Sequence, residues 1–329
     1  MLELKVKHLA CVAVLSCLLR IPPPAEGFCL FVRGAPPRPG LALRGGAVDK
    51  RGTTGLTAQL QASGRPKQAG PPLRCIVTGG SSGVGEAICR ALGQRGAKVF
   101  VTGRNEDNLR GAAAAVVEEG GYSSYGVGDV TVEADVKRLY AEAQTFFAAG
   151  ITMNSFGADV WVEGEEGIDV LVTSAGIGRF GAIEELSEAD FSASFDVNVK
   201  GTWLWAREVL PVMKQQGRGQ IVFISSVAGV RKFGRCSAYG ASKWAVQGIA
   251  GSLREECRGT NVKISTLCPG SVATPWWLER ERGGKEVPAT QEQLARMLTP
   301  ADCATACMTI IEQSVTSDIE TLVLEPPPM

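Results

Sequence analysis

Histidine is almost missing from this chain of 329 residues, whose single copy is His8. A Ser-His-Asp hydrolase uses histidine as its general base, and many zinc sites use histidine as a ligand. The sequence therefore excludes both kinds of site beyond the first residues. Aromatic residues make up only 6% of the chain, so we expect a core built mainly of Val, Ile, Ala and Leu.

Neither sign of charge is in excess, because 34 basic residues balance 34 acidic ones. The signs are unevenly divided: residues 1–74 hold 11 Lys and Arg against 3 Asp and Glu, and the rest hold 23 against 31. An acidic body binds nucleic acid poorly, so we expect no nucleic-acid partner. The apolar run from Leu9 to Leu19 is too short to span a bilayer comfortably, so we expect no stable membrane insertion.

The ten cysteines show no spacing typical of a disulfide framework, which favours a reducing compartment. Cys75, Cys89 and Cys268 fall in apolar segments and are expected to be small buried residues. Cys303 and Cys307 are one helical turn apart. Because two further ligands are lacking, core packing is favoured over metal binding, and we expect no metal site.

The first part of the chain has the pattern of a two-part targeting leader. Residues 1–27 combine two early lysines, an apolar run and a small-residue cleavage site, as in a signal peptide. Residues 28–72 are basic, with Asp49 as the single acid, and are expected to be a disordered, transit-peptide-like segment. This arrangement resembles leaders that route proteins into the complex plastids of algae. A plain secretory signal and a mitochondrial presequence are the alternatives.

Tyr239 and Lys243 are four residues apart in a stretch that we expect to be helical, so they share one face. An ammonium beside a phenol lowers the pKa of the tyrosine from its reference of about 10. Such a tyrosine can exchange a proton with a carbonyl or alcohol oxygen. Ser226, after the apolar run Ile221–Ile224, could hold the same oxygen. Alone, a Tyr-x-x-x-Lys pair is more often an ordinary helix-surface pair.

A serine at a strand end, followed by a tyrosine and a lysine on the next helix, resembles the active site of the short-chain dehydrogenase/reductase family. The resemblance runs from about Leu73 to Leu324. It implies one α/β domain over residues 73–329, with a doubly wound, mostly parallel sheet (a Rossmann fold). The implied strand order is 3-2-1-4-5-6-7.

The resemblance also implies roles for four residues. Tyr239 would exchange the proton, Ser226 would orient and polarise the oxygen, and Lys243 would lower the pKa of the tyrosine and bind the nicotinamide ribose. Asn198, within the helix pattern Phe191–Met213, matches the family's fourth catalytic residue. Its implied role is to hold a water that links the lysine to solvent.

A glycine-rich loop follows the first predicted strand and opens a helix pattern, reading T-G-G-S-S-G-V-G. Glycines let a backbone approach a pyrophosphate closely, and a helix N-terminus offers N–H donors. The loop matches the family's T-G-x-x-x-G-x-G spacing, so nucleotide binding is favoured over a mere tight turn. The residues expected to bind the cofactor here are Thr78, Gly79, Ser81, Ser82, Gly83, Val84 and Gly85.

The second predicted strand, Ala97–Thr102, ends in Gly103 and Arg104 without an acid. An NAD-preferring site usually has an acid at this place to hold the adenosine ribose. Arg104 could instead form a bidentate pair with a 2′-phosphate. The resemblance therefore implies NADP(H) as cofactor. NAD, with Arg104 as a solvated surface residue, is the alternative.

Other family matches extend the predicted cofactor site. Thr173 and Ser174 replace the two asparagines that the family usually has, and hydroxyls supply some of the same hydrogen bonds with shorter reach. Asp129 could also serve as an acid at the start of the next helix, which is compatible with cofactor binding. The matched positions are Asp129 and Val130 at the adenine, Ala175 and Gly176 beside the cofactor, and Pro269, Gly270, Val272 and Thr274 near the nicotinamide, together with Tyr239 and Lys243.

Two segments depart from a plain domain. Residues 148–167 form an insertion that could be a surface loop, a partner surface or an error in the gene sequence. Residues 275–298 are expected to form the substrate lid. Trp276 and Trp277 could line an apolar substrate pocket or simply pin the lid to the core.

The resemblance implies an NADP(H)-dependent oxidoreductase that interconverts a small-molecule carbonyl and a secondary alcohol, as a homodimer or homotetramer. A plastid 3-oxoacyl-[acyl-carrier-protein] reductase is an alternative, although this chain has Leu322-Val323-Leu324-Glu325-Pro326 near its C-terminus, where those enzymes usually have a T-G-Q…V-D-G-G segment. A non-catalytic NADP-binding regulator would lose catalytic side chains, and all four are present. A structural or interaction protein would depend on the acidic insertion.

Overall fold

A computed structural model gives the arrangement of most of the chain. The predicted targeting leader lies outside the described residues except for positions 29–31 and 71–72, as do most of the insertion and residues 278–289 of the predicted lid. The described residues are 29–31, 71–149, 151–152, 161–162, 166–277 and 290–327.

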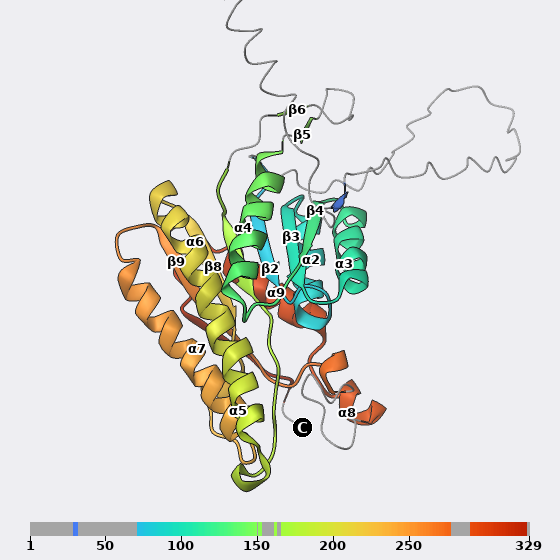
Figure 1. Cartoon of the computed structure of the whole chain (residues 1–329), viewed down its shortest axis with the longest axis vertical. Helices are drawn as coiled ribbons and strands as arrows, with labels where there is room; N and C mark the ends of the chain where they lie inside the picture. Colours follow the sequence, from blue (N-terminus) through green and yellow to red (C-terminus); the bar gives the residue numbers. More distant parts are fainter. Residues whose placement is uncertain are drawn as a thin grey trace, which may run out of the picture.

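An eight-stranded sheet stands at the centre, in the order β1-β4-β3-β2-β7-β8-β9-β10 (Figure 1). The strands from β4 to β10 are all parallel, and β1 pairs antiparallel with β4 at the edge. Counted along the chain, the parallel strands stand in the order 3-2-1-4-5-6-7, so the predicted order and fold class are confirmed. The strands are β1 (Cys29–Phe31), β2 (Arg74–Thr78), β3 (Lys98–Gly103), β4 (Tyr122–Val127), β7 (Val170–Thr173), β8 (Gly219–Ile224), β9 (Val262–Pro269) and β10 (Thr321–Leu324).

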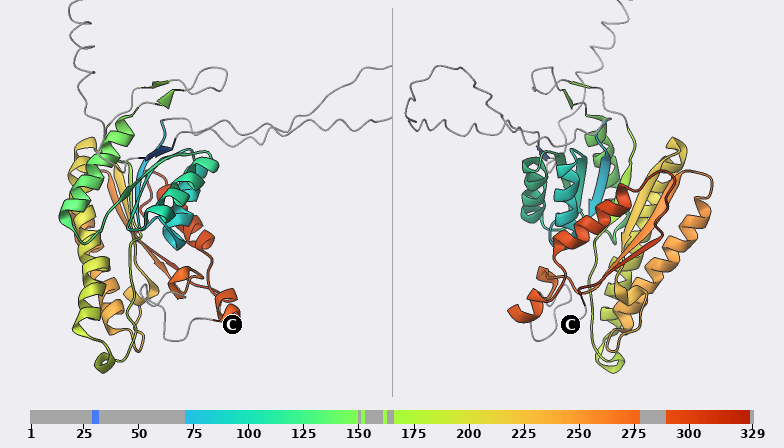
Figure 2. Two further views of the ribbon diagram at one scale, coloured as in Figure 1. Left: turned by 45° about the vertical axis from the view of Figure 1, so that its right-hand side comes forward. Right: turned by 180° about the vertical axis from the view of Figure 1, so that it is seen from behind.

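Helices cover both faces of the sheet, and Figure 2 shows the two layers from the side and from behind. One face carries α2, α3 and α9; the other carries α4, α6 and α7, with α5 continuing into α6. The helices are α2 (Gly83–Gln94), α3 (Glu106–Glu118), α4 (Glu133–Ala148), α5 (Glu188–Phe195), α6 (Thr202–Gln216), α7 (Ser237–Glu256), α8 (Gln291–Ala295) and α9 (Pro300–Ile311). None of the helices in the described part of the chain is long and apolar enough to cross a bilayer.

Alternate residues of the central strands face the two helical layers. In β3, Phe100 packs into the core cluster that contains Trp205, whereas Val99 and Val101 pack into the opposite cluster. Strands buried on both faces need apolar residues at successive positions, which is what β2, β3 and β8 have. Cys303 and Cys307 of α9 are fully buried, as the core-packing prediction requires.

The long helix predicted for Phe191–Met213 is three consecutive segments. α5 is followed by a π-helical turn, η2 (Asp196–Gly201), and then by α6. The whole run ends at Gly217, whose φ of 65° lies in the left-handed region that favours glycine. The prediction was therefore right in kind but missed the wider turn that contains Asn198.

Short elements complete the chain. Within the predicted insertion, β5 (Ile151–Thr152) and β6 (Trp161–Val162) pair antiparallel. The remaining short elements are the 3₁₀ turns η1 (Ile183–Glu185), η3 (Val227–Gly229) and η4 (Pro275–Trp277). η3 and η4 follow the carboxyl ends of β8 and β9, the edge where ligands bind in open α/β sheets.

Candidate active site

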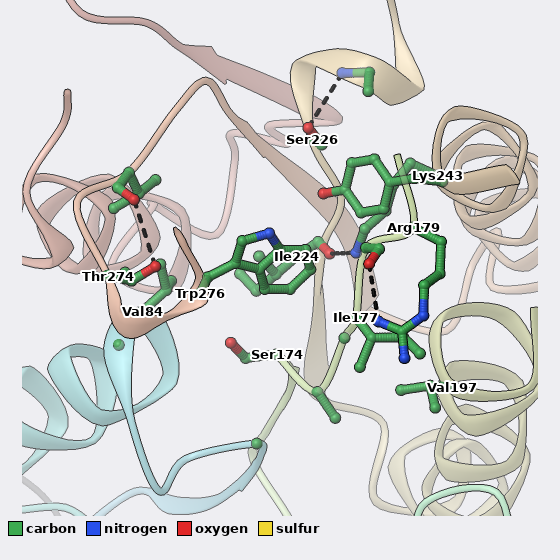
Figure 3. A pocket seen from close by; sticks show the side chains of 18 of the residues that line it. Val84, Ser174, Ile177, Arg179, Val197, Ile224, Ser226, Lys243, Thr274 and Trp276 are labelled. Carbon is green, nitrogen blue, oxygen red and sulfur yellow. Dashed lines mark hydrogen bonds between the residues drawn. The ribbon is translucent and has the colours of Figure 1, made fainter. Parts of the chain in front are cut away.

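A cleft of about 1400 Å³ runs along the carboxyl ends of the parallel strands (Figure 3). The strand order reverses at β2, whose neighbours are β3 and β7, and such a reversal opens a crevice for a ligand. The lining includes every residue predicted to bind the cofactor except Thr78: Gly79, Ser81, Ser82, Gly83, Val84, Gly85, Arg104, Asp129, Val130, Ala175, Gly176, Tyr239, Lys243, Pro269, Gly270, Val272 and Thr274.

The glycine-rich loop is held tightly against its neighbours. Gly79 has a φ of 62°, and a Cβ built on it would lie 2.6 Å from the Cα of Ala175. A Cβ on Gly85 would lie 2.3 Å from the carbonyl oxygen of Gly79. α2 begins at Gly83, so its positive N-terminal end borders the cleft. These features fit a pyrophosphate, since bare backbone and orphan N–H groups are what such a group needs.

Thr78 lies outside the cleft lining and hydrogen-bonds to the backbone of the loop after β7. Its side chain is buried, and its Oγ1 accepts a hydrogen bond from the backbone N–H of Ala175 at 3.2 Å. The prediction that Thr78 contacts the cofactor is therefore corrected: it is the last residue of β2 and joins that strand to the loop after β7.

The far end of the cleft carries Arg104 and Asp129. Arg104 is exposed just after β3 and makes no ion pair with any residue that the structure describes. Asp129 accepts a hydrogen bond from the N–H of Thr131 at 2.8 Å, which closes the turn leading into α4. Asp129 thus has the structural role weighed as its alternative, and it also lines the cleft. The uncompensated guanidinium of Arg104 fits an anionic group on a nucleotide ribose.

The three residues predicted to carry the chemistry meet at the other end. Tyr239 and Lys243 lie on the first turns of α7, and Ser226 follows β8. Ser226 Oγ accepts from the N–H of Ala228 at 3.2 Å and lies 3.4 Å from the Pro269 carbonyl, to which it donates. Lys243 Nζ donates to the carbonyl of Ile224 at 2.9 Å. The ends of β8 and β9 therefore position both partners of the tyrosine.

Burial shifts both ionisable groups toward their neutral forms. The pKa of Tyr239 is raised to about 12 by burial, which a hydrogen bond with Ser226 only partly offsets. Burial also lowers the pKa of Lys243 to about 8. The net shift of the tyrosine pKa is thus upward, and the predicted lowering of that pKa by Lys243 stays a prediction. The ammonium lies over the ring face, and burial of the phenol dominates.

Asn198 is fully buried in the π-helical turn η2, and its amide is satisfied by the protein. Its Oδ1 accepts from the N–H of Ile177 at 2.8 Å, and its Nδ2 donates to the Ile177 carbonyl at 2.8 Å and to Ser242 Oγ at 2.9 Å. Ser242 in turn donates to the carbonyl of Tyr239 at 2.7 Å. Asn198 therefore braces the loop after β7 against α7. Its predicted water-holding role stays a prediction.

The positions that replace the family's asparagines behave differently from each other. Ser174 lines the cleft, and its backbone N–H donates to the Thr78 carbonyl at 3.2 Å. Thr173 is buried, and its Oγ1 has no hydrogen-bond partner among the described residues. A buried hydroxyl without a partner costs free energy, so the Thr173 hydroxyl destabilises this end of the sheet.

Phe180 and Trp276 place aromatic rings around Tyr239, and sequence reasoning named only the tryptophans as candidates for the pocket. The ring centre of Phe180, from the loop after β7, lies 5.1 Å from that of Tyr239, and that of Trp276 lies 5.9 Å from it. Trp277 Nε1 donates to the Val272 carbonyl at 2.8 Å. Both alternatives for the tryptophans therefore apply: Trp276 and Trp277 both line the cleft, and Trp277 also pins the segment to the core. The one available signal was that Phe180 follows a predicted strand at the edge where all the site residues meet.

Known proteins match both the sequence and the fold. The family pattern described as short chain dehydrogenase matches residues 74–283. The chain is 29% identical over 258 residues to a sepiapterin reductase of Chlorobaculum tepidum, covering 76% of this chain and 95% of that protein. It is 30% identical over 269 residues to human dehydrogenase/reductase SDR family member 4, covering 78% and 90%.

A solved structure is similar over the same region. It is an alcohol dehydrogenase from the archaeon Thermococcus sibiricus complexed with 5-hydroxy-NADP, with a TM-score of 0.65 and 25% identity, and the match covers 78% of this chain and 97% of that one. The family pattern spans more than half of the sequence, and its residues build the cleft described above. This chain is therefore an oxidoreductase that belongs to the short-chain dehydrogenase family.

Proposed function

We propose that the protein is an NADP(H)-dependent oxidoreductase that interconverts a carbonyl and a secondary alcohol. The observation that carries this is the division of one cleft into two ends. Ser226, Tyr239 and Lys243 converge at one end, and Arg104, without an ion-pair partner among the described residues, stands at the other. The similar alcohol dehydrogenase was solved with an NADP derivative, which supports the same cofactor here.

The side chains can carry the proton transfer of such a reaction. When bound, NADP(H) supplies or accepts the hydride. Tyr239, with a pKa of about 12, keeps its proton at neutral pH and is therefore ready to donate it to a carbonyl oxygen. The hydroxyl of Ser226 can hold the same oxygen. Lys243, below its pKa of about 8, carries a positive charge that favours negative charge on the phenol as its proton leaves. Reduction is the direction that this protonation state favours.

Cofactor binding can be tested by titrating the protein with NADPH and with NADH and following the fluorescence of the reduced nicotinamide. We expect NADPH to bind more tightly. Arg104→Asp is expected to weaken NADPH binding by about tenfold or more and to leave NADH binding nearly unchanged, because it removes a charge-assisted pair worth roughly 1.5–3 kcal/mol. Arg110→Asp, an exposed arginine on α3 that does not line the cleft, is the control. Failure of both dinucleotides to bind would overturn the proposal.

We also propose that the chain forms a homodimer or homotetramer. Phe191 of α5 and Trp203 of α6 are large apolar residues that stand about half exposed. An apolar hollow of about 350 Å³ adjoins Trp203 and is lined also by Phe195, Val199 and Ile249. Light scattering of the purified protein tests this, and Trp203→Glu is expected to shift the mass toward that of one chain.

The cellular location proposed is the plastid, on the strength of residues 1–72 alone. Fusing these residues to a fluorescent protein in an alga with a complex plastid tests it. Fluorescence in the plastid is the expected result. Secretion of the fusion, or its accumulation in mitochondria, would replace the proposal with one of the two alternatives.

A further inference from the structure

The catalytic tyrosine is bordered by aromatic rings from two other elements. The Phe180 ring is tilted by 52° to the Tyr239 ring, and the Trp276 ring meets it edge-on at 67°. Trp277 stacks nearly parallel to Phe180, at 16° with ring centres 6.5 Å apart, and so fixes the orientation of that ring. In Figure 3 the indole of Trp276 projects into the cleft. Two rings thus border the tyrosine that a carbonyl must reach, and a third ring supports one of them.

A glycine lets these rings come close together. A Cβ built on Gly178 would lie 2.6 Å from Cε2 of Phe180 and 2.7 Å from Cζ2 of Trp276. Both distances are far inside van der Waals contact, so any side chain at this position would push one ring away. The lack of a side chain at Gly178 therefore allows the Phe180 and Trp276 rings to come this close together.

Four of the charged side chains at this end of the cleft form two ion pairs. Arg179 Nε lies 3.2 Å from an oxygen of Asp190, and Arg235 NH2 lies 2.5 Å from an oxygen of Glu185. The remaining cation, Lys243, is buried against the carbonyl of Ile224. Among the described lining residues at this end, Lys243 is the one charge without an acidic partner, and its ammonium is buried. A carboxylate or phosphate placed here would therefore lose water without meeting an accessible, unpaired cation.

From this arrangement we infer that the substrate is a planar, uncharged carbonyl compound, an aromatic or conjugated cyclic ketone, whose ring packs against the Phe180 and Trp276 rings beside Tyr239. The inference rests on the proposed function. In reduction the carbonyl carbon gains a hydride from NADPH and its oxygen gains the proton of Tyr239, so that the ketone becomes a secondary alcohol and NADPH becomes NADP⁺. Solvent returns the proton to the tyrosine.

The test compares kcat/KM, with NADPH, for acetophenone, cyclohexyl methyl ketone and 4-acetylbenzoate. The first two have the same carbon skeleton, but only acetophenone is planar, and conjugation makes it the less reactive ketone in solution. A higher kcat/KM for acetophenone than for cyclohexyl methyl ketone would therefore reflect how the site binds the ring, and not the reactivity of the ketone in solution. We expect a preference of about two- to tenfold, since an aromatic pair is worth roughly 0.5–1.5 kcal/mol. 4-Acetylbenzoate should fall at least about tenfold below acetophenone, because its carboxylate finds no partner.

Trp276→Leu is the diagnostic variant, because it keeps apolar bulk and removes the ring. The ratio of the two uncharged ketones is expected to fall to near one. Trp244→Leu is the matched control, since Trp244 is an exposed tryptophan of α7 that does not line the cleft. Gly178→Ala should lower kcat/KM for acetophenone by a larger factor than it lowers the affinity for NADPH. Titration with NADPH also reports whether that variant is folded.

The outcomes separate the inference from the proposed function. Equal turnover of the two uncharged ketones, or a ratio unchanged by Trp276→Leu, overturns the inference and leaves an NADPH-dependent reductase. Efficient use of an acetoacetyl thioester of an acyl carrier protein, which is linear and carries a phosphate, would overturn it in favour of a fatty-acid substrate. No turnover of any ketone by a protein that binds NADPH would overturn the proposed function as well.

Discussion

The ammonium of Lys243 lies 5.7 Å from the centre of the Tyr239 ring, and its hydrogen bond goes to a backbone carbonyl. In this structure the Lys243 ammonium therefore lies over the face of the Tyr239 ring. Burial acts on both, raising the pKa of the phenol and lowering that of the ammonium. The site keeps the tyrosine protonated, at the cost of holding a lysine away from water.

Because burial of the charged lysine costs free energy, replacing this residue should stabilise the protein. Lys243→Met should raise the free energy of unfolding near pH 7 by about 2 kcal/mol, after subtraction of about 1 kcal/mol for the lost hydrogen bond. The same variant should lose most of its reductase activity. Urea unfolding measures the first effect. Lys137→Met, at an exposed lysine of α4, should change the stability by no more than about 0.5 kcal/mol.

The gain should also depend on pH in a defined direction. The folded pKa of about 8 lies below the reference value of 10.5, so between these values the folded protein binds fewer protons than the unfolded chain. The lysine's contribution to wild-type stability therefore improves as pH rises through this window, and the advantage of Lys243→Met shrinks. An advantage of the same size near pH 7 and near pH 10 would contradict this account.

Tyr239→Phe tests the proton transfer directly. Removal of a general acid typically lowers a rate by about 10²–10⁴-fold, and we expect a loss in that range for carbonyl reduction. NADPH affinity should change little, because the ring remains. Stopped-flow reduction and fluorescence titration of the same preparation measure the two quantities. A variant that retains wild-type turnover would show that another group supplies the proton.

The two threonines at the ends of β2 and β7 offer a matched pair. Thr78 and Thr173 are opposite each other in the sheet and are both buried, but only Thr78 has a hydrogen-bond partner for its hydroxyl among the described residues. Thr173→Val should stabilise the protein by about 1 kcal/mol, and Thr78→Val should destabilise it by about the same amount. Denaturant unfolding of the two variants decides this, and the same sign for both would refute it.

A comparison of two glycines can separate the effect of backbone strain from the effect of close packing around the glycine-rich loop. Gly79 and Gly96 both have positive φ angles, of 62° and 73°, but a Cβ on Gly96 would meet nothing within 4 Å. Gly79→Ala should weaken NADPH binding by more than about tenfold, because it displaces the loop from Ala175. Gly96→Ala should only lower the stability, by about 1 kcal/mol. Comparable losses of NADPH affinity in both variants would remove the argument for close approach.

A buried ion pair at the start of β2 predicts how the fold responds to acid. Burial alone would raise the pKa of Asp169, but hydrogen bonds from Arg74 outweigh it and hold that pKa below its usual value. The pair's contribution is therefore present above about pH 4, near the carboxyl's unfolded pKa, and is lost as pH falls through the folded pKa. Asp169→Asn should cost about 3 kcal/mol near pH 7 and progressively less in acid.

The control for that prediction is Asp318→Asn, whose carboxylate pairs with Arg254 while half exposed. Exposed ion pairs contribute about 0–1 kcal/mol, so a small change is expected. Unfolding by urea at several pH values compares the two variants. A constant difference between wild type and Asp169→Asn down to strongly acidic pH would contradict the assigned role.

The positions of most strands and of the reactive side chains could be predicted from the sequence, because apolar runs and short motifs carry that information locally. The order of the strands came from the family resemblance that these motifs carry. Strand β4 was missed. Its Ser123 and Ser124 are fully buried although polar, and Ser123 Oγ donates to the Val99 carbonyl at 2.9 Å. Apolar periodicity cannot reveal a strand with buried serines, such as Ser123, whose hydroxyl is satisfied by a neighbouring strand.

The candidate site was predicted less completely than the fold. Spacing alone suggested that Lys243 would act on the phenolic oxygen, but the tertiary structure buries Lys243, half-buries Tyr239 and shifts the tyrosine pKa upward. Phe180 and Trp276 meet at Tyr239 only because the loop after β7 and the turn after β9 converge. Contacts between distant segments of this kind depend on loop conformation, which short motifs do not encode.

The connection between α4 and β7 leaves the sheet at the amino-terminal ends of the strands, and in Figure 1 β5 and β6 lie at the opposite end of the molecule from α8. The reacting groups all lie at the carboxyl ends. Extra length in this connection is therefore mechanically separate from the cleft. A reporter domain or an affinity tag could be spliced into it, and the same tolerance would let such a segment change in length or sequence between related chains without changing what the enzyme reduces.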